Sequence, residues 1–184
     1  MSELASMGQL RGSLLRWALF MVPGVLLLGL LSAQLAGGGV DNAWFEGLNK
    51  PSFYPSPIVF ALVWIVLYLL MGLALAMVAA ARGASSRNAA LVAFGVQLAL
   101  NLAWSPLFFG GHRILAALVL IVVLDLAVVA TIVLFQRVRP VAALLLLPYL
   151  GWILFASLLT WQFHVANPHA DGKDASGAVT RIQI

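Results

Sequence analysis

Long apolar runs alternate with short polar segments along almost the whole chain, and this pattern predicts membrane-spanning helices. Each run has about the 20 residues that an α-helix needs to cross a ~30 Å hydrocarbon core. Lipid offers the backbone no hydrogen-bond partners, and the runs lack the alternation of barrel strands, so helices are expected. The runs are Trp17–Ala36, Ser56–Ala81, Ala89–Phe109, Ile114–Gln136 and Val141–Val165.

The runs predict an all-α membrane protein built as a single five-helix bundle. Short connections make successive helices antiparallel neighbours, so we expect one domain over residues 17–165. A cytoplasmic N-terminal segment is expected over residues 1–16, and a polar, disordered tail over residues 166–184. The first run is longer than the ~7–15 apolar residues of a signal-peptide core, so we expect it to be retained.

Composition narrows the class of protein. Hydrophobic residues make up 63% of the chain and charged residues 9%, against about 25% charged in soluble domains, which excludes a water-soluble enzyme. There is no cysteine and no phosphate-loop, zinc-protease or serine-hydrolase motif, so no metal site or conventional catalytic residue is expected. The net charge of +4 does not indicate nucleic-acid binding. Membrane lipid is the expected partner. His112, His164 and His169 lie in or near loops at one end of the bundle, and we expect solvated histidines there, with an axial haem ligand as the alternative.

Positive charge is uneven between the two ends of the expected bundle. Lys50 and Arg113 flank the runs at one end. The positive-inside tendency therefore puts the other end, with the N-terminus, in the cytoplasm of a bacterial cell, and the first loop, Gly37–Pro55, and the C-terminus outside. The arginines at that cytoplasmic end are Arg11, Arg16, Arg82, Arg87, Arg137 and Arg139.

Asp125 is the one Asp, Glu, Lys or Arg inside any of the runs. A charged side chain at that depth is costly and usually faces the bundle interior with a partner. The expected partners are polar groups such as Asn101 on the third helix, or an indole or phenol donor. A hydrogen-bonded helix contact and a ligand or proton site remain open alternatives.

Aromatic and amide side chains recur at helical spacing, so each set shares one helix face. Amides and indoles facing lipid would leave donors unpaired, so these stripes should face inward. Spacing alone leaves a packed core and a ligand cavity open. The stripes are Trp64, Tyr68, Met71 and Leu75; Gln97, Asn101, Trp104 and Phe108; and Tyr149, Trp152, Ala156 and Thr160.

Four ordered motifs resemble those of the TspO/translocator-protein family, also called tryptophan-rich sensory proteins. They are Trp44–Pro55, Trp64–Met71, Gln97–Phe109 and Pro148–Ala156. The resemblance implies a homodimeric five-helix membrane protein that binds protoporphyrin IX, haem and related tetrapyrroles between the helices beneath the first loop. It favours a cavity over a packed core, and the porphyrin or haem would be a ligand, with no obligatory cofactor.

The resemblance and the stripes together define the expected ligand-binding residues. The resemblance also puts Trp152 at a family pocket position, and Lys50 or Arg113 is placed to meet porphyrin carboxylates at the outer rim. Gly37–Gly39 and the prolines of the first loop suit a lid. The expected set is Trp44, Trp64, Tyr68, Gln97, Asn101, Trp104, Phe108, Tyr149, Phe155, Ala156, Thr160 and Trp161.

By resemblance, the leading function is a receptor or sensor that regulates tetrapyrrole metabolism or stress responses. One alternative is a porphyrin transporter, although the runs show no inverted repeat. Another is a light-dependent porphyrin-degrading enzyme, in which Trp64 and Trp161 react with the excited pigment. The chain departs from the family at Phe53 and His164, and no Lys or Arg follows Tyr149 closely, so the cholesterol-recognition pattern is missing.

Two finer predictions concern the last and the third runs. Trp161 is rotated about 120° from Tyr149 and about 180° from Trp152, at ~100° per residue. We therefore expect Tyr149 and Thr160 to face the cavity, Trp161 to border its outer mouth, and Trp152 to be plain packing. On the third run, two pairs of small residues favour a dimer contact. They are Ala89 with Ala93 and Ala99 with Ala103.

Overall fold

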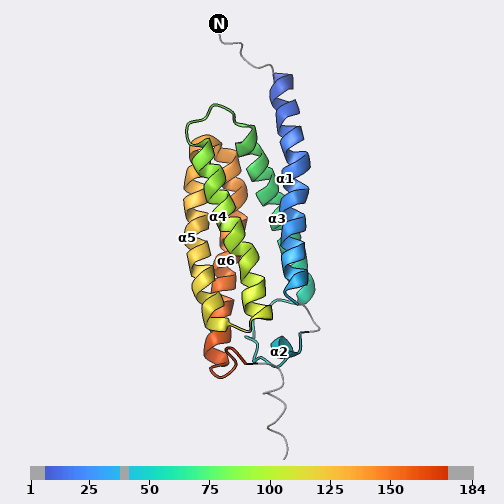
Figure 1. The fold of residues 1–184 in the computed structure, drawn as a ribbon, viewed down its shortest axis with the longest axis vertical. Coiled ribbons are helices and arrows are strands. Elements are labelled where there is room, and N and C mark those ends of the chain that lie inside the picture. The colour runs from blue at the N-terminus through green and yellow to red at the C-terminus, as the bar shows by residue number, and fades with distance from the viewer. Residues whose placement is uncertain (1–6, 38–41, 174–184) are drawn as a thin grey trace, which may run out of the picture.

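The computed structural model describes residues 7–37 and 42–173, with side chains described from residue 12. Within these ranges, five helices are long and apolar enough to cross a membrane, which confirms the all-α, five-helix fold. A four-residue helix, α2, lies in the first loop (Figure 1). The elements are α1 (Met7–Leu35), α2 (Ala43–Glu46), α3 (Pro57–Ala80), α4 (Arg87–Ser105) with the π-helical turn η1 (Pro106–Gly110), α5 (Ile114–Val138) and α6 (Pro140–Ala166).

The long helices pack in the order α1, α3, α6, α5, α4 around the bundle, and α4 touches α1 only sparsely. The start of α1, the α3–α4 connection and the α5–α6 connection share one end, whereas α2 and the end of α6 lie at the other (Figure 1). The arginines of the α3–α4 and α5–α6 connections therefore gather at the end opposite α2. The assignment of that end to the cytoplasm remains a prediction.

Several boundaries differ from the sequence-based ones. α1 begins at Met7, ten residues before the expected start at Trp17, because the helical pattern continues through the N-terminal segment. The third run ends in the turn η1, where the Gly111 N–H bonds the Pro106 carbonyl at 2.8 Å, a five-residue step. The tail expected to be disordered from residue 166 begins with packed turns up to Lys173, and residues 174–184 lie outside the described ranges.

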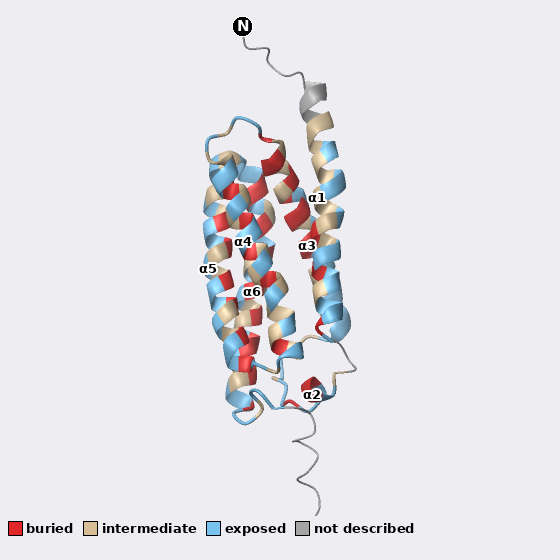
Figure 2. Cartoon of the chain, viewed as in Figure 1, coloured by how far each residue is buried: buried red, intermediate tan, exposed pale blue. Residues whose placement is uncertain are grey.

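Exposed residues lie on the outward faces of the long helices and buried residues on the inward faces (Figure 2). This is the burial pattern of a bundle whose outer surface meets lipid, since lipid tails favour apolar side chains as well as a core does. A large cluster of buried residues fills the bundle interior. A second, smaller cluster lies at the α2 end and contains Trp44, Phe45, Leu48, Phe108, Ile114, Ala117 and Phe163.

Two glycines let α1 and α3 approach closely. A Cβ on Gly72 of α3 would lie 2.6 Å from the Val22 Cα and 3.0 Å from the Met21 carbonyl oxygen of α1. A Cβ on Gly29 of α1 would collide with the ring of Tyr68 on α3. Small residues at a helix crossing are how membrane helices gain van der Waals contact. The position of α1, which forms one wall of the cavity described below, therefore depends on Gly72 and Gly29.

Replacing Gly72 by alanine is expected to separate α1 from α3, because the new Cβ meets backbone that cannot rotate away. Overpacking of this kind costs on the order of 1–3 kcal/mol of unfolding free energy. The matched control is Gly24→Ala on α1, where a Cβ meets nothing within 4 Å and alanine favours the helix by about 1 kcal/mol. Unfolding in a denaturing-detergent titration measures both, and equal stability of the two variants would contradict the close crossing.

Candidate functional site

A cavity of about 660 Å³ lies in the α2 half of the bundle. Its walls come from all five long helices, and its roof comes from α2 and the loop that follows it. The walls are mainly apolar and aromatic, as in most small-molecule sites. The cavity thus lies beneath the first loop, where the resemblance implies a pocket.

Two stacked aromatic pairs form flat parts of the wall. On α3, Trp64 stacks on Tyr68 with ring centroids 5.2 Å apart and an interplanar angle of 28°. On α4 and η1, Trp104 stacks on Phe108 at 4.9 Å and 11°. All four rings line the cavity. Rings at i and i+4 of a helix lie over one another, so the spacing of the stripes produces these pairs directly.

A chain of hydrogen bonds runs from the cavity wall into the bundle interior. The Tyr68 hydroxyl donates to Asn101 Oδ1 at 3.1 Å, and Asn101 Nδ2 donates to the Tyr149 hydroxyl at 3.1 Å. The Tyr149 hydroxyl donates in turn to Gln97 Oε1 at 3.0 Å. These groups come from α3, α4 and α6, so the chain ties three helices together at the depth of the cavity. Buried polar groups need such partners because lipid supplies none.

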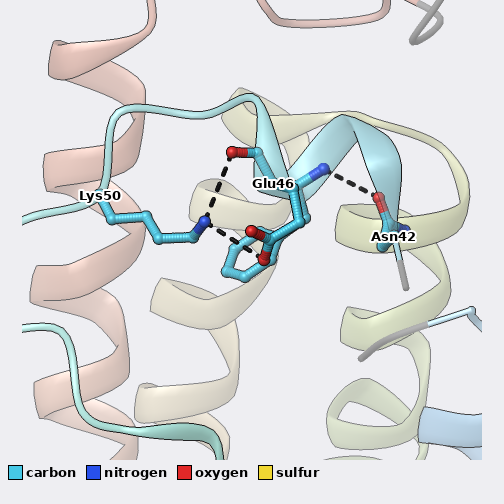
Figure 3. Close-up of polar contacts among 4 residues, drawn as sticks. Asn42, Glu46 and Lys50 are labelled. Carbon is cyan, nitrogen blue, oxygen red and sulfur yellow. Dashed lines mark hydrogen bonds and ion pairs between the residues drawn. The ribbon is translucent and has the colours of Figure 1, made fainter. Parts of the chain in front are cut away.

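The roof begins with a capped helix. Asn42 accepts the Phe45 N–H on its side-chain oxygen at 2.9 Å, which fixes the first turn of α2 (Figure 3). Trp44 is buried and stacks on His112 with ring centroids 4.6 Å apart. It also meets Phe108 edge-on at 5.5 Å, so its ring lies behind the wall and does not line the cavity.

Among the described residues, the charged side chains on the cavity lining are Glu46 and Lys50. Lys50 Nζ lies 3.3 Å from Glu46 Oε1 and 3.5 Å from the Glu46 carbonyl oxygen (Figure 3). The same ammonium lies 5.0 Å from the centre of the Phe45 ring. Burial and the nearby Glu46 carboxylate both raise the pKa of Tyr54 on the same roof above its ordinary value. Arg113, the other expected rim cation, does not line the cavity.

The structure brings most of the expected site residues to the cavity. Gln97 and Tyr149 are buried behind the wall and are linked to it through Asn101. The prediction that Tyr149 faces the cavity is therefore wrong. Phe155 contacts Phe53 and Trp152 instead. The expected residues that line the cavity are Trp64, Tyr68, Asn101, Trp104, Phe108, Ala156 and Thr160.

Trp161 is placed differently from the prediction that it borders the cavity mouth. Its side chain is 49% exposed on the outer surface of α6 and is absent from the cavity lining. The inward face of α6 follows steps of three and four residues through Ile153, Ala156, Thr160 and Phe163, which leaves the position after Thr160 pointing outward. Trp152 packs edge-on against Phe60 at 5.2 Å, in agreement with a packing role.

Asp125 pairs with a polar side chain of another helix, as expected, but that partner is not Asn101, an indole or a phenol. Its Oδ2 accepts the Ser157 hydroxyl of α6 at 2.8 Å. Ile121 and Leu124 point from α5 into the cavity, and Asp125 is therefore turned toward the α5–α6 contact. The hydrogen bond supports the helix-contact alternative.

Sequence reasoning missed the aromatic residues of the roof and of the last turn of α6. Phe163 lies three residues after Thr160, so extending that stripe by one turn would have found it. Phe45 and Tyr54 lie inside the first-loop motif, but no periodicity marks them. The contribution of α1 was missed because its small lining residues, Gly29 and Ala33, carry no distinctive chemistry.

Comparison with known proteins places these features in a family. A profile of the TspO/MBR family matches residues 21–166, which include every residue of the cavity lining. The chain belongs to the TspO/MBR family. The matched residues include α2 to α6 in full and the later part of α1.

Relatives within the family carry several names. The chain is 41% identical over 143 residues to a tryptophan-rich protein TspO of Archaeoglobus fulgidus, covering 78% of this chain and 92% of that protein. It is 36% identical over 148 residues to a tryptophan-rich sensory protein of Cereibacter sphaeroides, covering 79% and 89%. It is 40% identical over 134 residues to a translocator protein of Sus scrofa, covering 72% and 78%. The chain is thus a multi-pass membrane protein of the TspO type.

Proposed function

We propose that this protein is a membrane receptor that binds tetrapyrroles, protoporphyrin IX or haem, in the cavity and thereby senses and regulates tetrapyrrole metabolism. The observation that carries the proposal is the pairing of flat aromatic walls with a cation, Lys50, on the roof. A porphyrin is a large flat π-system with carboxylates on one edge, and it needs these two kinds of contact. The family resemblance supports the same ligand class.

The cavity has a suitable size and chemistry for such a ligand. Its volume of about 660 Å³ lies within the roughly 300–1,000 Å³ of small-molecule pockets. Trp64 and Trp104 offer faces for stacking, and Lys50 lies at the roof, where a propionate would reach it. The Asn101 amide, which is already hydrogen-bonded to both tyrosines, is a rigid edge of the wall.

Titration with protoporphyrin IX, followed by tryptophan quenching and by the porphyrin absorption, tests the proposal. Trp64→Ala should weaken binding by one stacking contact, ~1–3 kcal/mol by analogy with base stacking, or roughly 5- to 150-fold. Trp161→Ala is the matched control and should leave affinity within about twofold, because its indole faces outward. No saturable binding by the folded wild-type protein would refute the proposal, and new product absorption under light that depends on Trp64 would indicate an enzyme.

Lys50 provides a second test, directed at the carboxylate edge of the ligand. Lys50→Met should weaken protoporphyrin IX binding about two- to fivefold, the range of an ion pair that is partly exposed to solvent. The dimethyl ester of the porphyrin has no carboxylate, so its affinity should be the same for both proteins. Arg113→Met is the control and should bind like wild type. If Lys50→Met weakens binding of the porphyrin acid and of its dimethyl ester equally, Lys50 does not bind the carboxylates.

We further propose that the protein forms a homodimer in a bacterial cell membrane. Support comes from the exposed small residues of α4, Ala89, Ala99 and Ala103, which allow close approach of a second helix. Light scattering of the detergent-solubilised protein measures the oligomeric state. A monomer would refute the homodimer. If Ala103→Leu is still a dimer, the dimer contact does not lie on α4.

A further inference from the structure

The first residues after α6 fold back over the α2 end of the bundle and bind the cavity roof. This segment, Asn167–Gly172, is named the strap here. The Asn49 N–H donates to Asn167 Oδ1 at 2.8 Å, and Asn167 Nδ2 donates to the Asn49 carbonyl at 3.1 Å. Asn167 is 8% exposed, and its Nδ2 also bonds the Phe163 carbonyl at the end of α6. One buried amide therefore pairs with both backbone groups of a roof residue and anchors them to a spanning helix.

Further contacts attach the strap on both sides. The Trp44 indole N–H of α2 donates to the Ala170 carbonyl at 3.3 Å. The Gly172 N–H donates to the His112 carbonyl at 2.7 Å. Asp171 Oδ1 accepts the Leu115 N–H in the first turn of α5 at 3.3 Å. The strap thus connects the roof with the α4–α5 connection and with the ends of α5 and α6.

The clamped residues are next to those that cover the cavity. Asn49 directly precedes Lys50, and Phe45, Glu46 and Lys50 line the cavity. The roof has little regular structure of its own, since α2 has four residues. Segments with few internal hydrogen bonds open at low free-energy cost unless other contacts hold them. The contacts that hold this roof include the paired bonds between Asn49 and Asn167.

We propose that the strap is a latch on the cavity roof, and that Asn167 is the positioning residue that sets how fast ligands enter and leave. Breaking the Asn49–Asn167 pair removes two of the hydrogen bonds that hold the roof to the end of α6, and so lowers the free-energy cost of opening the cavity at the loop end. Because the latch can re-form over an occupied cavity, it changes the rates of association and dissociation together and leaves affinity nearly unchanged. This inference concerns access to the cavity and holds for any ligand that enters through the roof.

The absence of cysteine from the chain allows a test that needs no ligand. Ser105→Cys puts one thiol on the cavity wall, and a charged, water-soluble methanethiosulfonate reagent reports how often the roof opens. Adding Asn167→Ala should speed labelling about tenfold, the size expected from losing two net hydrogen bonds. The control Asn49→Ala loses the side-chain bond to the Ala166 carbonyl but keeps both backbone bonds, so labelling should stay within about twofold.

Reagent reactivity and folding are controlled separately. Ser52→Cys lies on the exposed outer part of the loop, and its labelling should not respond to Asn167→Ala. Thermal unfolding identifies a variant that fails to fold. In that case Asn167→Asp, which keeps the acceptor for the Asn49 N–H, replaces alanine and should give a smaller acceleration. If Ser105→Cys is labelled at the same rate alone and in combination with a folded Asn167 variant, the latch proposal is overturned.

Stopped-flow binding of protoporphyrin IX as the probe gives an independent readout. In Asn167→Ala the association and dissociation rate constants should both rise about tenfold, with Kd within about threefold. A residue that contacted ligand would raise dissociation and Kd, and a merely structural role would lower the number of binding sites; either result would overturn the latch. If the wild-type protein binds no porphyrin, the proposed function fails, and the labelling experiment still decides the latch.

Discussion

Filling the cavity from α6 is expected to abolish tetrapyrrole binding while the bundle remains folded. Ala156 lines the cavity and is 8% exposed, and an indole at this position would project between the aromatic walls. We expect Ala156→Trp to weaken protoporphyrin IX binding by on the order of a hundredfold or more, about 2.8 kcal/mol at 1.4 kcal/mol per tenfold. The cavity volume of about 660 Å³ gives the added ring room without forcing the helices apart.

The matched control for this substitution is Ala130→Trp on α5. Ala130 is exposed on the outer surface and does not line the cavity, so the same added indole meets lipid there. Binding by Ala130→Trp should equal that of wild type. Unfolding of both variants is followed by circular dichroism in detergent. Full porphyrin affinity in a folded Ala156→Trp variant would show that the ligand binds elsewhere.

Replacing Asn101 by leucine is expected to be among the most destabilising single changes in the bundle. It removes the acceptor of the Tyr68 hydroxyl and the donor to the Tyr149 hydroxyl, and it leaves a buried phenol without a partner. An unsatisfied buried donor costs about 1–3 kcal/mol, and each interhelical hydrogen bond in a membrane adds about 0.6 kcal/mol. We therefore expect the free energy of unfolding to fall by roughly 2–4 kcal/mol.

Two further variants show whether the network causes this loss. Thr131 is buried, but its hydroxyl bonds the Ala127 carbonyl of its own helix, so Thr131→Val should cost less than about 1 kcal/mol. In the double variant Asn101→Leu with Tyr68→Phe, the orphaned hydroxyl is gone, so the loss should be smaller than the sum of the single losses. Additive losses in this cycle would contradict coupling between Tyr68 and Asn101.

Much of the cavity wall could be predicted because helical periodicity and lipid leave few alternatives. Trp64 and Tyr68, or Asn101, Trp104 and Phe108, share a face by spacing alone, and the amide and indole groups force that face inward. Periodicity works less well on α6, where aromatic residues lie on several faces. Trp161 and Thr160 are neighbours in sequence, yet one points outward and the other lines the cavity.

Partners across helices could not be predicted from the chain. Asp125 was recognised as the polar residue needing a partner, but Ser157 was not identified because serine is unremarkable in a membrane helix. The rotation of α5 relative to α6 decides that contact, and rotation depends on packing over whole helix lengths. The same reason explains why Tyr149 reaches the cavity only through Asn101.

By itself, the sequence determined that the chain crosses the membrane as a five-helix bundle of the TspO type, and which aromatic stripes face inward. These follow from local physics, since hydrocarbon requires helices of about 20 apolar residues and inward polar faces. Only the tertiary structure decided the cavity volume, the close α1–α3 crossing at Gly72 and the pairing of Asn49 with Asn167 across the roof. These depend on how side chains far apart in sequence meet, and no local pattern encodes such a distance.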